Sequence, residues 1–128
     1  MEVTEKMKVS VLMAEPVIAI DENSSAQEAA ETMGKEHIGS LLVTRRGTNV
    51  GIVTERDIMS NVIAVKGNLE EVKVKAIMST PLVTIDKDAD AEDAIKTMVK
   101  RKVRRLLVTD KGKIVGIFTT SDVTKLAL

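Results

Sequence analysis

The sequence of 128 residues contains no cysteine, no tryptophan, no tyrosine and a single phenylalanine, Phe118. Without cysteine, the chain can form neither a disulfide nor a thiolate metal site. The near absence of aromatic side chains removes the stacking surfaces on which single-stranded nucleic acids usually bind. The only histidine, His37, cannot build a metal cluster or a catalytic triad by itself.

The sequence also lacks an excess of charge of one sign, because 19 basic residues balance 19 acidic residues. A balanced chain creates no overall field that would attract DNA or an anionic membrane. No run approaches the roughly 18 apolar residues of a membrane span. The N-terminal MEVTEKMKVS has no apolar stretch long enough for a signal peptide. We therefore expect a cytoplasmic protein without a membrane partner.

Catalytic motifs are missing as well. The sequence has no His-Glu-x-x-His and no second histidine, and its Lys111-Gly112-Lys113 lacks the glycine-rich approach of a Walker loop. Its many carboxylates form no recognisable acid–base pair. We predict no catalytic residue, no metal site and no obligatory cofactor, and hence a protein that is not an enzyme.

What the sequence does contain is one unit written twice. Residues 9–58 align without a gap with residues 74–123, at an offset of 65, and 20 of the 50 positions are identical. LLVT recurs unchanged, and GIVTERDI in the first copy returns as GIFTTSDV in the second. A gap-free match of this length indicates an internal duplication.

Each copy predicts the same order of elements. A short apolar turn, VSVLM or VKAIM, is followed by a proline that leads into an alternating strand, PVIAID or PLVTID. Ser25 with Glu28, or Asp90 with Asp93, then predicts the capped start of an amphipathic helix. Two apolar strands joined by a glycine turn, RRGTN or DKG, come next, and a threonine caps a second helix. The predicted order is β-α-β-β-α, an α+β fold.

One copy of about 50 residues buries too little apolar surface to fold by itself, so we expect the two copies to share one core. We predict one domain of two halves related by an approximate two-fold axis. The expected boundaries are an N-terminal extension at 1–8, a first unit at 9–63, a linker at 64–73 and a second unit at 74–128.

The motif Gly-h-h-Thr-x-x-Asp, in which h is apolar, places Thr54 and Asp57 in the first copy and Thr119 and Asp122 in the second. One interpretation is structural, because Thr-x-x-Asp is typical of a helix N-cap with its partner carboxylate. The other is chemical, because a carboxylate can accept two hydrogen bonds from a ribose diol and a helix N-terminus favours anions. Capping does not exclude binding.

Over residues 9–126 the chain resembles a tandem pair of CBS domains, named after cystathionine beta-synthase and also called a Bateman module. Met-x-x-Pro before the first strand, the LLVT strand and the two copies of Gly-h-h-Thr-x-x-Asp carry the resemblance. It implies two CBS units packed through their sheets, with an adenosine-containing ligand such as AMP, ADP or ATP in a cleft between them. It also implies a regulatory homodimer whose output passes to an effector protein or to its own oligomer.

The resemblance implies that the motif aspartates hold the ribose, that the motif threonines lie near ribose or phosphate, and that Arg104 and Arg105 meet the phosphates. Guanidinium suits phosphate because it donates two parallel hydrogen bonds. The first copy has Gly39-Ser40 at these positions, so its site would bind phosphate poorly unless Arg56 compensates.

An adenine pocket would have to be aliphatic here, and the backbone around Val17, Ile18, Leu82 and Val83 is the candidate. Three alternatives remain. The sites could be vestigial in a pure assembly module, or the ligand could be S-adenosylmethionine or NAD. Nucleic-acid binding is favoured only by the basic run KRKVRR, whose helical charges are also explained by the dipole of the preceding helix.

Overall fold

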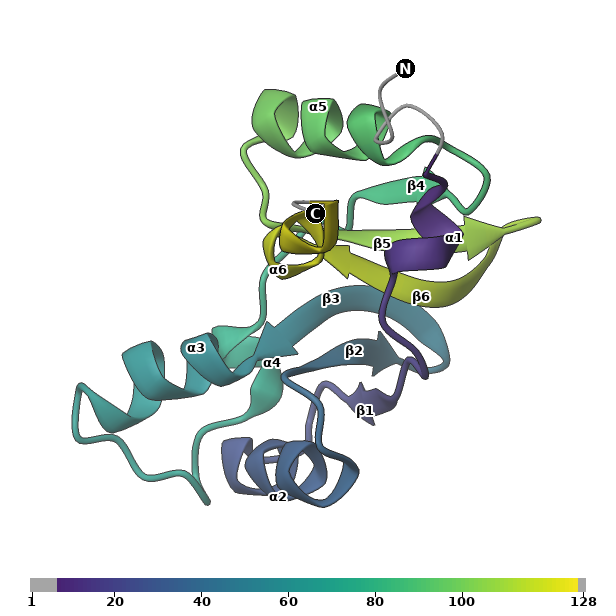
Figure 1. The fold of residues 1–128 in the computed structure, drawn as a ribbon. Helices are drawn as coiled ribbons and strands as arrows, with labels where there is room; N and C mark the ends of the chain where they lie inside the picture. Colours follow the sequence, from purple (N-terminus) through teal and green to yellow (C-terminus); the bar gives the residue numbers. More distant parts are fainter. Residues whose placement is uncertain (1–6, 127–128) are drawn as a thin grey trace. The chain divides into compact units, whose positions relative to one another are not determined.

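The computed structural model describes residues 7–126, so most of the predicted N-terminal extension and the last two residues lie outside the described part. Contacts divide the chain into two compact units (Figure 1). One, here called the first-repeat unit, is Ile18–Leu82. The other, the second-repeat unit, joins the segment that ends at Val17 to the segment that starts at Val83.

The first-repeat unit has the predicted order of elements. These are β1 (Ala19–Asp21), α2 (Ala26–Glu36), β2 (Ser40–Arg45), β3 (Thr48–Thr54) and α3 (Glu55–Ile58), followed by the π-helical segment η2 (Met59–Ile63) and by α4 (Val74–Ile77). The strands form one sheet in the order β1-β2-β3. β1 runs parallel to β2, which pairs antiparallel with β3.

The second-repeat unit repeats this architecture. It consists of α1 (Val9–Leu12), β4 (Thr84–Asp86), α5 (Ala91–Arg101), β5 (Arg105–Asp110), β6 (Lys113–Thr119), α6 (Thr120–Val123) and the 3₁₀ turn η3 (Thr124–Leu126). Its sheet has the order β4-β5-β6, again with one parallel and one antiparallel pair. The predicted β-α-β-β-α order is thus confirmed in both copies.

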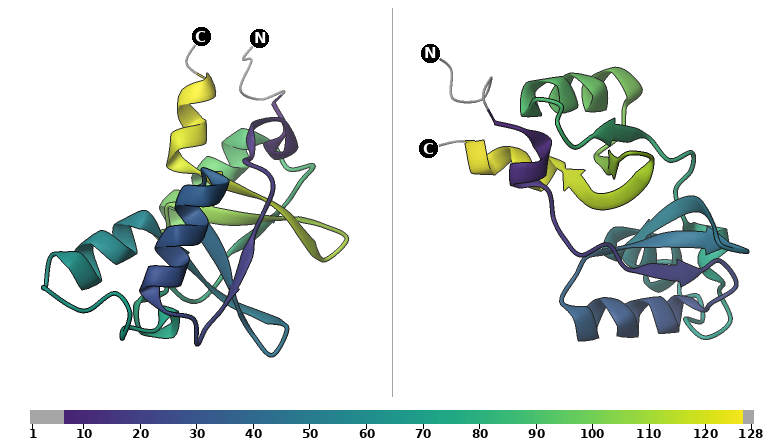
Figure 2. Two further views of the ribbon diagram at one scale, coloured as in Figure 1. Left: turned by 90° about the horizontal axis from the view of Figure 1, so that it is seen from below. Right: turned by 90° about the vertical axis from the view of Figure 1, so that its right-hand side faces the viewer.

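The apolar turn that opens each copy in the sequence packs with the other copy. α1 buries Val9 and Leu12 in the core of the second-repeat unit, and Figure 2 shows α1 beside α6 in both views. Correspondingly, α4 buries Val74 and Ile77 in the core of the first-repeat unit. The compact units therefore differ from the sequence repeats by an exchange of these two helices.

The glycine of the repeated motif is explained by this exchange. A Cβ at Gly51 would lie 2.8 Å from Met78 Sδ and 2.9 Å from the carbonyl oxygen of Ser79. At Gly116 it would meet Met13 Sδ in the same way. Only glycine lets the chain that follows α1 or α4 approach the strand closely enough to hydrogen-bond with it.

Each unit encloses a hydrophobic core of its own residues. The first-repeat core combines the inner faces of β2, β3 and α2 with Val62 of η2 and both apolar residues of α4. Phe118, the only aromatic side chain, is fully buried in the second-repeat core. The exchanged helix adds apolar surface to the core of each unit, and in the first-repeat unit the segment after α3 adds more.

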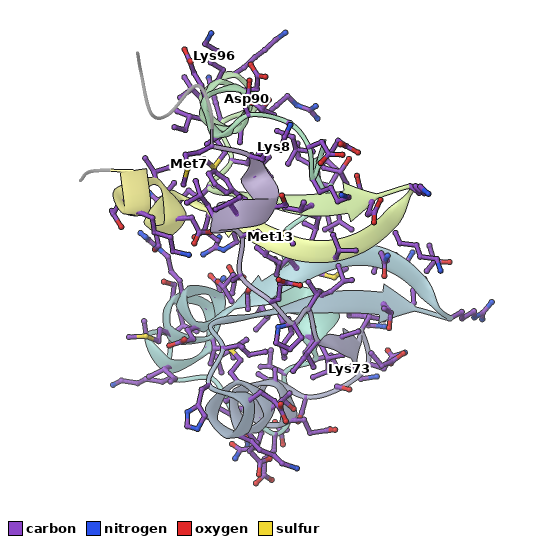
Figure 3. All side chains as sticks on the ribbon, turned by 45° about the vertical axis from the view of Figure 1, so that its right-hand side comes forward. Met7, Lys8, Met13, Lys73, Asp90 and Lys96 are labelled. Carbon is purple, nitrogen blue, oxygen red and sulfur yellow. The ribbon has the colours of Figure 1, made fainter. Side chains whose placement is uncertain are left out.

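Two local predictions need correction. β1 and β4 start three residues after the prolines, so the predicted strands at PVIAID and PLVTID are only three residues long. Asp90 stands at the N-cap of α5 but makes no side-chain capping bond. The carbonyl of Met7 instead accepts a hydrogen bond from the N–H of Ala91 at 2.7 Å, and Lys8 pairs with Asp90 through the backbone (Figure 3).

The other caps and the hairpin turns are as predicted. Ser25 and Glu28 form a reciprocal capping box at the start of α2. β2 and β3 are joined by Arg46 and Gly47, which have φ values of 49° and 80°. Two successive residues with positive φ are typical of the tight turn that matches the twist of a hairpin, and β5 and β6 are joined in the same way.

Candidate ligand-binding sites

In the first-repeat unit, Thr54 and Asp57 form a capping box at the start of α3. The Asp57 carboxylate accepts hydrogen bonds through Oδ2 from the N–H of Thr54 at 2.9 Å and from its hydroxyl at 3.0 Å. The N–H of Asp57 donates back to Thr54 Oγ1 at 3.1 Å. Thr54 is buried and Asp57 half-buried. The structural role predicted for the motif is therefore confirmed in this copy.

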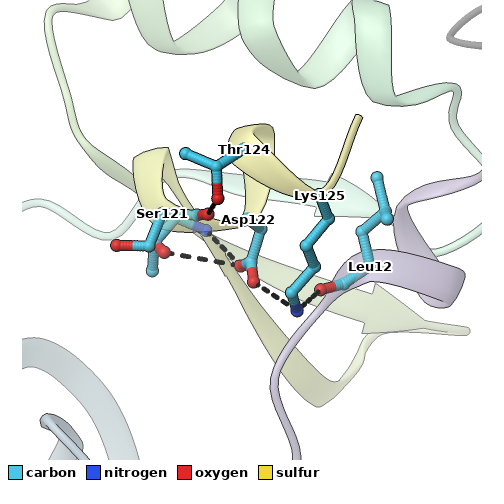
Figure 4. Close-up of polar contacts among 6 residues, drawn as sticks. Leu12, Ser121, Asp122, Thr124 and Lys125 are labelled. Atoms are coloured by element: carbon cyan, nitrogen blue, oxygen red, sulfur yellow. Dashed lines mark hydrogen bonds and ion pairs between the residues drawn. The ribbon is translucent and has the colours of Figure 1, made fainter. Parts of the chain in front are cut away.

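In the second-repeat unit, the Asp122 carboxylate is held on both oxygens. Its Oδ2 accepts a hydrogen bond from the N–H of Thr119 at 2.8 Å. Its Oδ1 lies 2.8 Å from Nζ of Lys125, in η3, and the same ammonium donates to the carbonyl of Leu12 at 2.8 Å (Figure 4). Asp122 is buried, and the Lys125 contact is one that the sequence analysis missed.

The two candidate phosphate ligands lie beside the motif threonine of the second repeat. Arg105 is the direct cross-strand neighbour of Thr119, and the carbonyl of Arg104 accepts a hydrogen bond from the N–H of Thr120 at 3.1 Å. The side chain of Arg104 is exposed, whereas Arg105 is half-buried and has a polar interaction of its own. The backbone thus brings the basic pair to the end of the strand that carries the motif.

The first repeat has the same backbone arrangement without the basic side chains. Ser40 stands across from Thr54, and the carbonyl of Gly39 accepts a hydrogen bond from the N–H of Glu55 at 3.1 Å. Arg56, which we considered as a compensating cation, is exposed on α3. The two repeats therefore offer the same carboxylate in different electrostatic surroundings.

The candidate adenine-reading segments are partly used by the sheets. The carbonyl of Ile18 accepts a hydrogen bond from the N–H of Leu42 at 2.9 Å, and that of Val83 accepts one from Leu107 at 2.9 Å. The side chain of Val83 is buried in the second-repeat core, while Val17 and Leu82 are half-buried. A role of these segments in binding a base remains a prediction.

A pocket that we did not predict lies between α2 and α3 of the first-repeat unit. It has a volume of about 410 Å³. Its walls are small and apolar residues, with Glu55 and His37 as the polar members; they are Ala30, Met33, Gly34, His37, Ile38, Gly39, Glu55, Ile58 and Met59. The sequence contained one signal for this pocket, because the second repeat has the larger residues Val99 and Arg104 at the positions of Gly34 and Gly39.

A short ion pair marks the opposite end of β2. Arg45 Nε donates to Glu22 Oε2 at 2.7 Å, and the Glu22 side chain is only 9% exposed. The hydrogen bond from Arg45 holds the pKa of the Glu22 carboxyl below its usual value. Among the described residues, Glu22 Oε1 has no hydrogen-bond partner. The second repeat has Lys87 and Asp110 at these positions, so the charges are reversed.

Within residues 7–126, no three His, Cys, Asp or Glu side chains are grouped so that they could hold a metal ion. None of the helices described there is long and apolar enough to cross a membrane.

The duplicated fold and its two Thr-x-x-Asp sites define a tandem CBS module, and comparison with known families agrees. The family model of the CBS domain matches residues 8–64 and 74–128. The chain therefore belongs to the CBS-domain family, which consists of regulatory, ligand-binding modules.

Relatives share this assignment. An uncharacterized protein of Methanopyrus kandleri is 38% identical over 109 residues, which cover 84% of this chain and 56% of that protein. The chain thus spans about half of that relative. A CBS domain-containing protein of Bacillus subtilis is 33% identical over 110 residues, covering 86% of this chain and 78% of the relative.

Solved structures have the same fold. An uncharacterized conserved protein from Pyrococcus horikoshii superposes with a TM-score of 0.82 at 30% identity, covering 96% of this chain and 93% of the other. The hexameric CBS-CP12 protein from bloom-forming cyanobacteria gives a TM-score of 0.83 at 25% identity, covering 92% and 69%.

Proposed function

We propose that the protein is a regulatory module that binds an adenosine nucleotide of the AMP, ADP or ATP kind at its Thr-x-x-Asp sites. The observation that carries the proposal is the neighbourhood of Asp122. The motif aspartate lies in α6, directly after β6, and accepts a hydrogen bond from the N–H of Thr119, which stands directly across from Arg105. A carboxylate for a diol is thereby supplied by the first turn of α6 and a guanidinium for a phosphate by the neighbouring start of β5.

Binding at such a site would act by population shift. A ligand that favours one arrangement of the module changes its population only by the difference in its affinity for the two arrangements. The change would be passed on through an effector protein or through the module's own oligomer. The proposal involves no reaction, and it places the protein in the cytoplasm, where adenine nucleotides are abundant.

The proposal is tested by nucleotide binding to the purified full chain. A ligand at 100 times its dissociation constant should stabilise the fold by about 2.7 kcal/mol, which thermal unfolding followed by circular dichroism detects. AMP, ADP, ATP, NAD and S-adenosylmethionine are the probes. Because the chain has no Trp or Tyr, absorbance near 260 nm also reports any nucleotide that is carried through purification. Absence of a shift with all five probes contradicts the proposal.

A pair of cap variants separates ligand binding from capping. Asp57→Asn and Ser25→Ala each weaken a capping box of the first-repeat unit. We expect both to lose a similar, modest amount of stability, but only Asp57→Asn to lose nucleotide affinity. If the two variants bind nucleotide equally well, Asp57 is a cap and nothing more.

The α2–α3 pocket favours a second function, self-assembly, that is compatible with the first. Met59, which lines the pocket, and Ile63, at the other end of η2, expose 61% and 57% of their surface. The second repeat replaces the pocket residue Gly34 with Val99, which is 74% exposed on α5. One copy therefore presents an apolar hollow where the other presents an apolar projection.

The charges of α2 and of the C-terminal end of α5 are complementary as well. α2 carries Glu28, Glu31 and Glu36 against a single lysine, whereas five of the six residues 100–105, which span the last residues of α5 and the segment after it, are basic. We propose that α5 of one molecule docks on the α2–α3 face of a second copy, which gives a homodimer with unlike units in contact. The hexameric state of the cyanobacterial neighbour supports self-association of this fold.

Sedimentation velocity of Val99→Glu tests the dimer. Glutamate places a charge against an apolar, acidic surface, so we expect the dimer to dissociate, while Lys113→Glu, on the exposed start of β6, serves as the matched control. Raising the salt concentration should weaken the wild-type dimer because it screens the complementary charges. A monomeric wild type, or a Val99→Glu variant that stays dimeric, refutes this arrangement.

A further inference from the structure

Lys125 makes the two Thr-x-x-Asp sites unequal. Its ammonium lies 2.8 Å from Asp122 Oδ1 and donates to the Leu12 carbonyl at 2.8 Å, so it joins the motif carboxylate to the end of α1 (Figure 4). The Asp122 side chain is 8% exposed and that of Lys125 is 51% exposed. A contact with a largely buried carboxylate is screened less than a surface pair and is therefore energetically significant.

The lysine occupies the oxygen that a ligand would use. Asp122 Oδ2 already accepts hydrogen bonds from the N–H of Thr119 at 2.8 Å and from its hydroxyl at 3.4 Å, so Oδ1 is the oxygen left for a ribose hydroxyl. Lys125 fills that position. A sugar diol can therefore reach the carboxylate fully only when the ammonium moves away.

The first repeat has no equivalent of this contact. Ser60 stands at the position that corresponds to Lys125. Asp57 accepts hydrogen bonds from Thr54 through Oδ2, and no partner of its Oδ1 is found within the described range 7–126. The first-repeat carboxylate is therefore ready to accept a ligand hydroxyl, and the second-repeat carboxylate is not.

The same lysine caps α1. A helix leaves its last carbonyl groups without intrahelical partners, and a lysine near the C-terminus satisfies one of them. In α1, which has only four residues, the Leu12 carbonyl receives this bond from residue 125. Loss of the Lys125 contact would thus loosen both the site and the N-terminal helix that packs on the second-repeat core.

We propose that Lys125 is a latch on the second-repeat site, and that a nucleoside phosphate bound at Asp122 displaces it and releases the end of α1. The inference rests on the proposed nucleotide function. It assigns the regulatory response to the second repeat, where binding is coupled to a structural change. In the first repeat, the ligand binds without such a change. The arginines of the second repeat supply phosphate contacts that offset the cost of breaking the latch.

The latch predicts that removing the lysine tightens binding. The reference protein is Asp57→Asn, in which nucleotide binding reports on the second site alone. It is compared with three double variants, in which Lys125→Met, Lys125→Arg or Lys113→Met is added to Asp57→Asn. A hydrogen bond to a charged group is worth about 1.5–3 kcal/mol, so Lys125→Met should bind AMP or ATP roughly tenfold tighter or more. Lys125→Arg keeps the cation and should stay latched, and Lys113→Met should change nothing.

Isothermal titration with AMP and with ATP measures these affinities, and hydrogen exchange at α1 reads the latch directly. We expect the α1 amides to exchange faster in Lys125→Met without ligand, and in the wild type when nucleotide is bound. Unchanged affinity in Lys125→Met overturns the latch, and weaker affinity overturns it by showing that the lysine holds the ligand.

The result also separates the latch from the proposed function. Failure of every variant to bind either nucleotide refutes the nucleotide function and, with it, displacement of the lysine by ligand. Normal binding without any effect of Lys125→Met refutes the latch alone. Binding that becomes measurable only after Lys125→Met supports both.

Discussion

Replacing Gly51 with alanine tests whether the repeated motif keeps its glycine for packing. The new Cβ would lie 2.8 Å from Met78 Sδ and 2.9 Å from a backbone carbonyl oxygen, and the carbonyl cannot simply swing aside. Overpacking of this kind costs typically about 1–3 kcal/mol. For a chain of this length, about 1 kcal/mol corresponds to a shift of roughly 4 °C in Tm, so Gly51→Ala should lower Tm by about 4–12 °C.

Gly34→Ala is the matched control, because it makes the same chemical change where space is open. No atom lies within 4 Å of a Cβ at Gly34, which is inside α2. Alanine in a helix interior is favoured over glycine by about 0.5–1 kcal/mol, so this variant should gain roughly 2–4 °C. Gly116→Ala should behave like Gly51→Ala, because its Cβ would meet Met13.

Thermal unfolding followed by far-ultraviolet circular dichroism is the appropriate assay, because the chain lacks the Trp and Tyr that fluorescence would need. Several protein concentrations separate the stability of the fold from self-association. If the Tm of Gly51→Ala equals that of the wild type or that of Gly34→Ala, the close approach of the segment after α4 does not explain the glycine.

Three further predictions follow from the same structure. Ser25→Ala should cost about 1 kcal/mol, whereas Asp90→Ala should cost little because Asp90 makes no capping bond; urea unfolding compares them. Glu22 has a lowered pKa in the folded state, so the stability that its carboxylate contributes is present above the unfolded carboxyl pKa and is lost as the pH falls through the folded pKa. The difference in Tm between wild type and Glu22→Gln should therefore shrink below about pH 4.3. Phe118→Ala should cost about 3–5 kcal/mol, because the ring is fully buried, and a smaller loss in urea unfolding would contradict that burial.

The parts of the fold that could be predicted are those encoded locally. The capping box at Ser25, the hairpin turn at Gly47 and the order of elements along each copy depend on residues close in sequence, and the duplication repeated the turn and the element order. The cap expected at Asp90 failed because a backbone carbonyl from the start of the chain takes part there instead. Spacing within a helix contains no information about such a distant segment.

The features that were missed depend on tertiary structure. The exchange of α1 and α4 cannot be read from the repeat, because both apolar turns have the same pattern and either could pack on either sheet. Lys125 donates to a carbonyl 113 residues away, and its ion pair with Asp122, three residues earlier, was also missed. The α2–α3 pocket could be predicted only from the positions at which the two copies differ.

Those differences fall at the proposed ligand and docking sites, and they favour the proposal that the module is an asymmetric sensor. The residues that build the scaffold, namely the motif glycines, LLVT and Thr-x-x-Asp, are the same in both copies. By contrast, Gly39-Ser40 becomes Arg104-Arg105 and Ser60 becomes Lys125. Only the second copy therefore combines a cationic strand end with a carboxylate that is held closed. Capping accounts for a carboxylate at this position in both copies, whereas the cation that pairs with Asp122 alone is not required by capping and is what the proposed sensor adds to the second copy.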